Sequence, residues 1–238
     1  MRARPPVPSG AVCGRFISRS SPAALAAYVG AEEIVAPDLG ERFNVAPTDE
    51  VYGVAVRSGR RVLGTFRWGL VPSWSTSPSG GARMINARAE TLSDKPAFRE
   101  ALRRRRCLIP ADGFYEWVRT GSGRQAFHLH RSEGGPMVFA GLWESWRDRV
   151  AVDGTRLVTC TIVTTTANAV VGPVHDRMPV VLEPPVWDDW LDPGNDDVAE
   201  LGSLLVPARE DLLVVERVGS RVNDVRNDGP DLVEPVTA

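Results

Sequence analysis

The sequence is almost without lysine. Lys95 is the only lysine among 28 lysine and arginine residues in a chain of 238. An enzyme that holds its substrate as a Schiff base on a lysine side chain would therefore depend on Lys95. That residue precedes Pro96 at a predicted helix start, with no acid or base motif around it. The sequence thus gives little support to a lysine-based active site.

Cysteine and histidine are also scarce. Cys13, Cys107 and Cys160 lie far apart and form no CxxC pair, which argues against a disulfide framework and a thiolate zinc site. His128 and His130 share a predicted strand but have no partner nearby in the sequence. We therefore predict no metal and no cofactor.

Long apolar runs and an excess of positive charge are missing as well. No stretch approaches the ~18 apolar residues of a membrane span, and residues 1–12 lack the apolar core of a secretory signal. We expect a cytoplasmic protein that does not bind membranes. The net charge of −2 means that any nucleic acid must be bound by a local groove.

What the sequence does contain is a series of short β-forming runs with fewer helical patterns between them. The runs cover residues 51–56, 61–71, 107–118, 125–131, 137–146, 156–166, 178–182 and 212–218. Helices are predicted at 23–30, 96–104, 187–191 and 198–205, and a flexible loop at 77–83. Strands and helices do not alternate, so we predict an α+β fold: a single domain with a largely antiparallel, barrel-like sheet. That domain would span 13–238, after a disordered extension at 1–12.

Polar residues interrupt the apolar pattern at several places. In "MINARAET", strand alternation puts Asn86, Arg88 and Glu90 on one face. In "PADGFYEW", Glu116 stands between two aromatic residues, a setting that would raise the pKa of its carboxyl group. His175 opens the run "HDRMPVVL". Each has an ordinary explanation too, such as a turn, a solvent-facing strand position or a loop ion pair. Singly, none of them identifies a function.

Together, these places form a recognisable order of motifs. The chain contains "CGRF", "RFNVAPT", "RWGLVPSW", "MINARAET", "CLIPADGFYEW", "HDRMPVVL" and "VNDVRNDGP", which cover nearly everything from Cys13 onward. In these motifs it resembles the SOS response-associated peptidase (SRAP) family, also described as 5-hydroxymethylcytosine-binding proteins of the embryonic-stem-cell type. The resemblance implies a sensor of abasic sites in single-stranded DNA, acting in DNA repair and the SOS response. The family's N-terminal cysteine forms a thiazolidine with the opened abasic sugar, and this covalent link shields the lesion.

Carried over motif by motif, the resemblance assigns residues to roles. The implied catalytic residues are Cys13, Asn86, Glu116 and His175. The implied DNA-binding residues are Arg15, Asn44, Pro47, Trp74 and Arg88. We expect a monomer whose partner is single-stranded DNA with abasic sites, and which is associated with the nucleoid when bound.

The chemistry requires a free amine next to the thiol. A terminal amine attacks the sugar aldehyde to give an imine, and the thiol on the adjacent carbon then closes a five-membered ring. Glu116 would transfer protons, His175 would assist sugar opening, and Asn86 would orient Cys13. Because Cys13 follows Val12 in the written chain, its nitrogen is an amide. We expect either a mis-assigned start, with a GTG codon at Val12 read as methionine, or proteolytic removal of residues 1–12.

Two other functions stay open. The first is a cysteine peptidase, a hydrolase that acts in cis to expose Cys13, with His175 as base and Asn86 or Glu116 as the orienting group. The second is non-covalent recognition of modified bases by a binding module without catalysis. The main prediction is a DNA–protein crosslinking enzyme with lyase-type chemistry.

Overall fold

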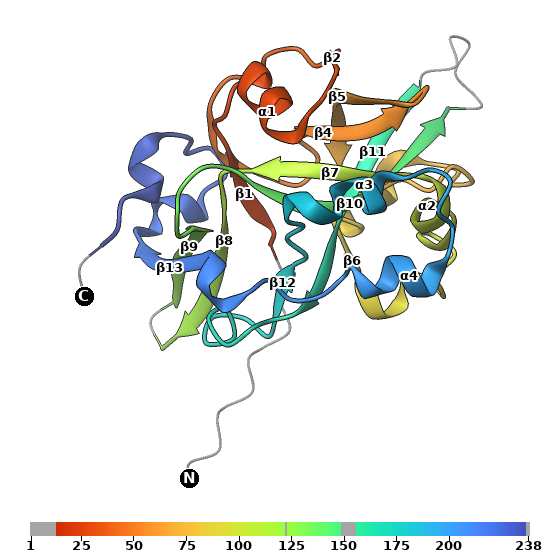
Figure 1. Cartoon of the computed structure of the whole chain (residues 1–238). Coiled ribbons are helices and arrows are strands. Elements are labelled where there is room, and N and C mark those ends of the chain that lie inside the picture. Colours follow the sequence, from red (N-terminus) through yellow and green to blue (C-terminus); the bar gives the residue numbers. More distant parts are fainter. Residues whose placement is uncertain (1–12, 122, 149–155, 237–238) are drawn as a thin grey trace.

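The computed structural model describes residues 13–121, 123–148 and 156–236 (Figure 1). The disorder expected for residues 1–12 concerns a segment outside these ranges. No helix in the described ranges is long and apolar enough to cross a membrane.

A closed barrel of five strands forms the centre of the molecule. Its strands are β4 (Glu50–Arg57), β5 (Arg60–Trp68), β7 (Arg106–Ala111), β10 (Met137–Arg147) and β11 (Arg156–Thr166). They pair in the order β11-β10-β7-β4-β5, and β5 then pairs in parallel with β11 through Cys160 and Trp68. This last pairing closes the ring and leaves Trp68 and Cys160 fully buried.

Short strands extend this sheet at both ends. β6 (Asn86–Arg88) runs parallel to β11, with Asn86 opposite Ile162. β12 (Arg177–Pro179) runs antiparallel to the same strand, with Pro179 opposite Thr164. β2 (Glu33–Ile34) pairs with β5 at the other end. The chain segments that carry Asn86 and His175 therefore both approach the end of β11.

A second, antiparallel sheet packs beside the barrel. It contains, in spatial order, β13 (Leu213–Val218), β9 (Gly123–Arg131), β8 (Gly113–Thr120), β1 (Arg15–Ser18) and β3 (Arg42–Val45). One apolar cluster lies between the sheets and includes Phe16, Phe114 and Phe139, whose rings meet edge to face. Burying these aromatic rings supplies much of the stabilisation between the two sheets.

In the described part of the chain, four short α-helices cover the outside of the barrel. They are α1 (Pro22–Val29), α2 (Arg99–Arg104), α3 (Trp187–Leu191) and α4 (Val198–Ser203). α1 begins where the Ser21 side chain accepts a hydrogen bond from the Ala24 nitrogen, and it ends at Gly30 in the left-handed region (φ 65°). The predicted helices are thus confirmed, with α2 starting three residues later and α4 ending two residues earlier than expected.

The structure confirms the α+β, largely antiparallel, barrel-like fold and corrects two details. The predicted strand 107–118 is two strands, β7 and β8, which belong to different sheets. The chain bends at Asp112, whose carboxylate accepts hydrogen bonds from the backbone nitrogens of Arg19 and Ser20. The predicted flexible loop 77–83 contains a 3-10 helix, Pro78–Arg83, that begins after Ser77.

Candidate active site

Cys13 lies two residues before the start of β1 and is completely buried. Its backbone is in the left-handed region (φ 45°), which is unusual for a residue other than glycine. Its backbone nitrogen donates a hydrogen bond of 2.6 Å to Oε1 of Glu116 on β8. The structure therefore joins two predicted catalytic residues that are far apart in the sequence.

Glu116 has an unusually high affinity for its proton. Only 2% of the residue is exposed, and Phe127 is its partner on the neighbouring strand β9. Burial raises the pKa of the carboxyl group to about 8, although hydrogen bonds from the Cys13 and Trp117 nitrogens oppose this change. The negative charge of Asp176 raises the pKa further. Glu116 can therefore exchange a proton near neutral pH.

The predicted direction of this pKa change is confirmed, but the predicted cause is wrong. Strand alternation turns Tyr115 and Trp117 to the opposite face of β8 from Glu116. Tyr115 donates its hydroxyl hydrogen to the Phe43 carbonyl oxygen, and Trp117 donates its indole hydrogen to Asn223. Glu116 is shielded from water by the apolar contact between the two sheets, not by the rings beside it in the sequence.

The Cys13 thiol is held in its protonated form. Burial raises its pKa well above the usual value, and the nearby Glu116 raises it further. A thiolate is favoured by exposure and by neighbouring positive charge, whereas Cys13 is buried beside the carboxyl group of Glu116. The thiol thus has little nucleophilicity of its own until another group accepts its proton.

His175 precedes β12 and is also buried. Its Nδ1 lies 2.9 Å from an oxygen of Asp176 and 3.0 Å from the backbone nitrogen of Arg177. The first contact favours a protonated Nδ1, whereas the second requires Nδ1 as an acceptor. Asp176 acts on both His175 and Glu116, so it connects these two predicted catalytic residues electrostatically.

Asn86 occupies the first position of β6 and is partly buried. The predicted alternation holds from Ile85 to Arg88, because Ile85 and Ala87 are buried while Arg88 is exposed. It does not extend to Glu90, which lies in a 3-10 helix, Ala89–Thr91, that follows the strand. Ile85 belongs to the same apolar cluster as Cys13. The orienting contact between Asn86 and Cys13 stays a prediction.

Two of the predicted DNA-binding residues, Arg15 and Asn44, contact each other. Arg15 Nη1 donates to Asn44 Oδ1 over 2.9 Å and to the Val222 carbonyl oxygen over 3.2 Å. Asn44 is buried, and its Nδ2 donates to backbone oxygens of the C-terminal segment, among them those of Asp224 and Asn227. The Asn44 side chain is therefore engaged within the fold and positions Arg15.

The other predicted DNA-binding residues are more accessible. Trp74 has 61% of its surface exposed, which is unusual for an indole ring, and Arg88 is exposed on β6. Pro47 is partly buried in the turn between β3 and β4. The exposed ring and guanidinium group are available to a ligand.

Trp117 was missed by the sequence analysis. The guanidinium carbon of Arg15 lies 5.9 Å from the centre of its ring, a cation–π arrangement. The Trp117 indole nitrogen donates to Asn223 over 2.6 Å. Asn223 belongs to the "VNDVRNDGP" motif, which marked the segment without indicating a role. That segment therefore holds Arg15 in two ways: directly through the Val222 carbonyl oxygen, and indirectly through the Trp117 ring.

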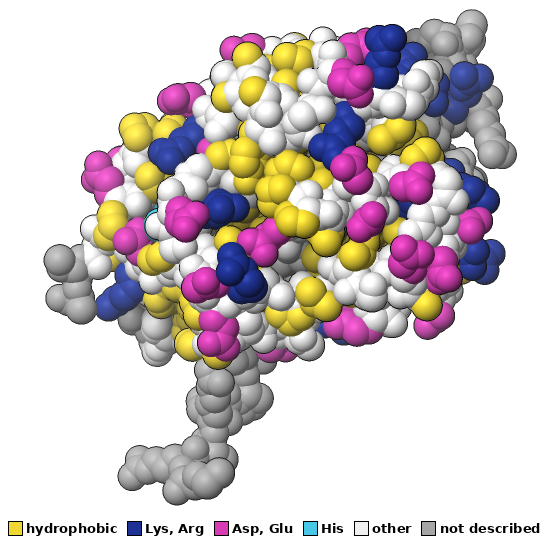
Figure 2. All heavy atoms as spheres, viewed as in Figure 1, with side chains coloured by type: hydrophobic (Ala, Val, Ile, Leu, Met, Phe, Trp, Pro, Cys, Tyr) yellow, Lys and Arg dark blue, Asp and Glu magenta, His cyan; other side chains and the backbone are white. Residues whose placement is uncertain are grey.

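Charge is not uniform over the surface. On the face shown in Figure 2, acidic side chains are frequent over α3 and α4, where Asp188, Asp189, Asp197 and Glu200 are located. Basic side chains on this face are interspersed with apolar ones. A polyanion would meet repulsion over these two helices.

Comparisons with known proteins agree with this picture. The family model described as SOS response associated peptidase (SRAP) matches residues 12–225. The chain is 42% identical over 193 residues to the abasic site processing protein YoqW of Bacillus subtilis, covering 81% of this chain and 85% of YoqW. It is 29% identical over 232 residues to the abasic site processing protein YedK of Escherichia coli, covering 94% and 100%.

A solved structure shows the same fold. A crystal structure of a protein from Bacteroides thetaiotaomicron matches with a TM-score of 0.82 at 24% identity, covering 94% of this chain and 100% of that one. The family model covers most of the chain, including the Cys13–Glu116 pair. The chain therefore belongs to the SOS response associated peptidase (SRAP) family.

Proposed function

We propose that this protein processes abasic sites in single-stranded DNA by capturing the open sugar on Cys13 as a thiazolidine. The observation that carries the proposal is the 2.6 Å hydrogen bond from the Cys13 nitrogen to Glu116. The carboxyl group is thereby bound to the atom that would become the attacking amine. Relatives that are named abasic site processing proteins support the coarser part of the proposal, the processing of abasic sites.

The first step is the attack of the amine on the sugar aldehyde. A terminal amine has a pKa near 8, and the Glu116 carboxyl group has a raised pKa of about 8. Because burial favours the protonated carboxyl group, a proton can pass from the ammonium to the carboxylate, which leaves a neutral amine. The amine adds to the aldehyde carbon, Glu116 returns the proton to the hydroxyl group, and water leaves to give an imine.

The second step closes the ring. The Cys13 sulfur adds to the imine carbon while the thiol proton passes through Glu116 to the nitrogen. One water molecule is lost overall, and no oxidant, reductant or metal is required. The raised thiol pKa suits this order of events, because the thiol reacts only once the imine and the proton acceptor are in place.

His175 and Asn86 act on the sugar and on Cys13, respectively. The imidazolium form of His175 carries a proton on Nε2 and can donate it to the sugar oxygen as the sugar opens, which returns the ring to the neutral form whose Nδ1 accepts the Arg177 N–H. Asp176, 2.9 Å from Nδ1, stabilises the imidazolium form. Asn86 orients Cys13 by a neutral hydrogen bond.

The DNA strand is bound by groups around Cys13. Arg15 and Arg88 contact phosphates, and Trp74 stacks where the base is missing. Asn44 and Pro47 shape the same groove, with Asn44 acting by holding Arg15. We propose that the protein works as a monomer, and that it associates with the nucleoid when it is bound to DNA.

This chemistry requires a free nitrogen on Cys13, so we propose that the active chain begins at this residue. Residues 1–12 would be absent through a start at Val12 or removed by proteolysis, and 13–238 would be the working domain.

A thiolate peptidase, the alternative, fits this site less well. Peptidases of that kind lower the pKa of the nucleophilic thiol with a neighbouring base or positive charge. Here burial and Glu116 raise the thiol pKa, and Glu116 hydrogen-bonds to the nitrogen of Cys13. Cleavage before Cys13 in cis would be a maturation step that serves the DNA chemistry.

The test is a denaturing gel with single-stranded DNA that carries one abasic site. A chain that begins Met-Cys13, with the methionine excised, should give a shifted band, whereas the intact 238-residue chain, checked by mass, should not. Cys13→Ser should lose the stable band but leave an imine that borohydride traps. Abasic DNA reduced to the alcohol beforehand is the matched control.

Efficient crosslinking by an intact, amide-linked Cys13 would contradict the amine mechanism. Binding to the same DNA that leaves no band after denaturation would instead support non-covalent recognition. Cleavage of the extension that depends on Cys13, without any DNA crosslink, would favour the peptidase.

A further inference from the structure

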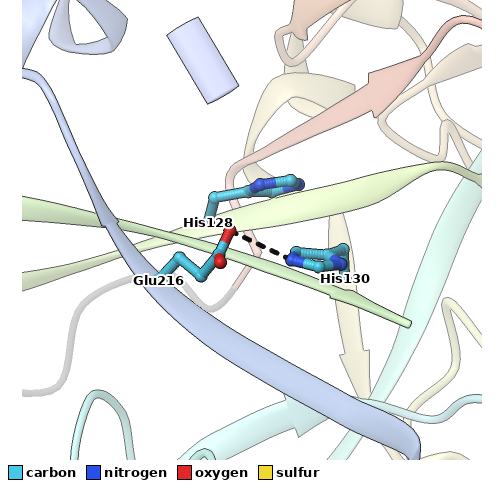
Figure 3. A group of neighbouring side chains, drawn as sticks. All are labelled: His128, His130 and Glu216. Carbon is cyan, nitrogen blue, oxygen red and sulfur yellow. Dashed lines mark hydrogen bonds and ion pairs between the residues drawn. The ribbon is translucent and has the colours of Figure 1, made fainter. Parts of the chain in front are cut away.

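Two histidines and a glutamate meet on the second sheet, one strand away from β8 (Figure 3). His128 and His130 occupy alternate positions of β9, and Glu216 on β13 is the cross-strand partner of His128. One ligand atom from each of the three residues lies within 4.8 Å of the others. The sequence analysis found no partner for the two histidines, because Glu216 approaches only when β13 pairs with β9.

His130 has the hydrogen-bonding arrangement that is typical of metal-binding histidines. Its Nδ1 lies 3.0 Å from the Arg131 carbonyl oxygen, to which it can donate a hydrogen. That hydrogen bond places the lone pair on Nε2, which faces Oε2 of Glu216 at 3.2 Å. A histidine that ligates a metal usually donates its other N–H to such a carbonyl oxygen. Two acceptor atoms this close require a cation between them, either a proton or a metal ion.

His128 provides the second observation. It is only 8% exposed, and neither ring nitrogen has a hydrogen-bond partner among the described residues. A buried imidazole without a partner is costly, whereas a neutral imidazole is the form that binds a metal.

The fold keeps room for the His128 ring. A side-chain carbon on Gly113 of β8 would lie 2.4 Å from His128 Nε2. The glycine of the "ADGFYEW" segment therefore admits the imidazole against the strand. The two histidine rings stack with centroids 4.7 Å apart, so both lie on the same side of β9 as Glu216.

We propose that His128, His130 and Glu216 bind one divalent transition-metal ion, with Zn²⁺ as the best match. Two imidazole nitrogens and a carboxylate oxygen are a known zinc ligand set that leaves a fourth position for water. Ligand atoms about 2.0–2.2 Å from a tetrahedral ion lie closer together than 4.8 Å. Zinc binding would therefore require the three side chains to rotate slightly toward one another.

The bound ion would stabilise the attachment of the edge strand β13 to its neighbour β9. β13 is the last strand of its sheet and leads into the segment that holds Asn44 and Arg15. A metal that bridges β9 and β13 joins them by bonds to side chains in addition to the backbone hydrogen bonds. Its role is thus structural, and it takes no part in the chemistry at Cys13.

Zinc titration of the full chain, stripped with a chelator, tests the site. All proteins carry Cys13→Ser, which removes the thiol of the proposed active site as a competing zinc ligand, while Cys107 and Cys160 are buried in the core. We expect one equivalent of Zn²⁺ to bind and to raise the melting temperature, and Co²⁺ to give visible absorption bands. Glu216→Gln should weaken zinc binding by roughly 100-fold. Changing a residue that only hydrogen-bonds to a metal ligand costs about 10–100-fold in metal affinity, and the loss of a ligand itself should cost at least as much.

The matched control is Glu210→Gln, an exposed glutamate in the 3-10 helix just before β13. It should bind zinc and respond to heat like the parent, while His130→Gln should behave like Glu216→Gln. Glu216 is partly exposed, so its variant should fold. Equal zinc binding by the parent and Glu216→Gln would overturn the proposal. So would a parent that binds no zinc at millimolar concentration, because the His130–Glu216 contact would then be an ion pair alone.

Discussion

The nitrogen of Cys13 and the carboxyl group of Glu116 are joined by a 2.6 Å hydrogen bond between residues 103 positions apart. The bond exists because β1 pairs with β8, with Arg15 opposite Tyr115, and Cys13 lies just before β1. Pairing of these strands therefore brings the proposed nucleophile to its proton acceptor. The predictions below test that relationship and the groove around it.

Glu116→Gln should slow the formation or release of the crosslink by roughly 10²–10⁴-fold, because Gln cannot accept or return a proton at neutral pH. Rates are measured from quenched time courses on denaturing gels, using the chain that begins at Cys13. Lys95→Arg, which removes the single lysine, is the control and should leave both rates unchanged. Wild-type crosslinking rates for Glu116→Gln, together with no crosslinking by Lys95→Arg, would contradict this assignment and indicate an active site at Lys95.

Asp176→Asn should shift the pH dependence of crosslinking to lower pH. The negative charge of Asp176 raises the pKa of Glu116, so its removal lets the carboxylate form at lower pH. Asn keeps an oxygen near His175, so that contact is altered least. The measurement is the crosslinking rate between about pH 5 and pH 9. Asp189→Asn on α3 is the control, and a shift to higher pH would contradict the electrostatic link.

Glu116→Gln should also change how stability depends on pH in the full chain, where the Cys13 nitrogen is an amide. The folded-state pKa of about 8 lies above the ordinary value of 4.5. The wild type therefore loses stability as pH rises between these values, by about 1.4 kcal/mol per pH unit at most. The variant lacks this loss, so its relative stability should rise with pH and level off above pH 8. Urea unfolding at a series of pH values measures it.

Glu90→Gln is a control for which the pH dependence of the free energy of unfolding should change in the opposite direction. Burial alone would raise the pKa of Glu90, but its hydrogen bonds and charge contact with Arg177 lower it overall. Its contribution to stability is therefore present above the unfolded pKa and lost as pH falls. This variant should be less stable than wild type at neutral pH and similar in acid. Parallel pH curves for the two variants would rule out the assigned pKa changes.

Arg88→Ala should weaken binding to all single-stranded sequences alike and reduce the salt dependence of affinity by about one contact, ~0.7 in log–log slope. Arg88 is exposed on β6 and available to a phosphate. Arg104→Ala, which removes an exposed arginine paired with Asp196, should leave the slope unchanged. A sequence-selective loss for Arg88→Ala with an unchanged slope would mean that Arg88 contacts a base.

Much of the fold followed from local patterns, since strand alternation and helix caps depend on neighbouring residues. α3 matches its predicted range, and Ser21 and Gly30 bound α1 as expected. The division of 107–118 at Asp112 was missed, because the sequence of a strand does not say which sheet it joins. The bend depends on Arg19 and Ser20, which are distant in the sequence.

The site shows the same limit. Motifs identified Cys13 and Glu116, but their hydrogen bond, the burial of Asn44 and the ring of Trp117 beneath Arg15 depend on strand pairing. The rise in the pKa of Glu116 was predicted from the wrong neighbours, because alternation turns adjacent residues to opposite faces. Glu216, which completes the histidine cluster, has no local signal at all.

The left-handed backbone of Cys13 has a further consequence. A φ angle exists only where a residue is preceded by a peptide carbonyl group, and a positive value costs a non-glycine residue roughly 1–2 kcal/mol. A chain whose first residue is Cys13 has no such angle, so this cost disappears together with the peptide bond. The backbone conformation at Cys13 is therefore strained only when other residues precede it in the chain. This loss of strain would favour the start at Cys13 that we propose.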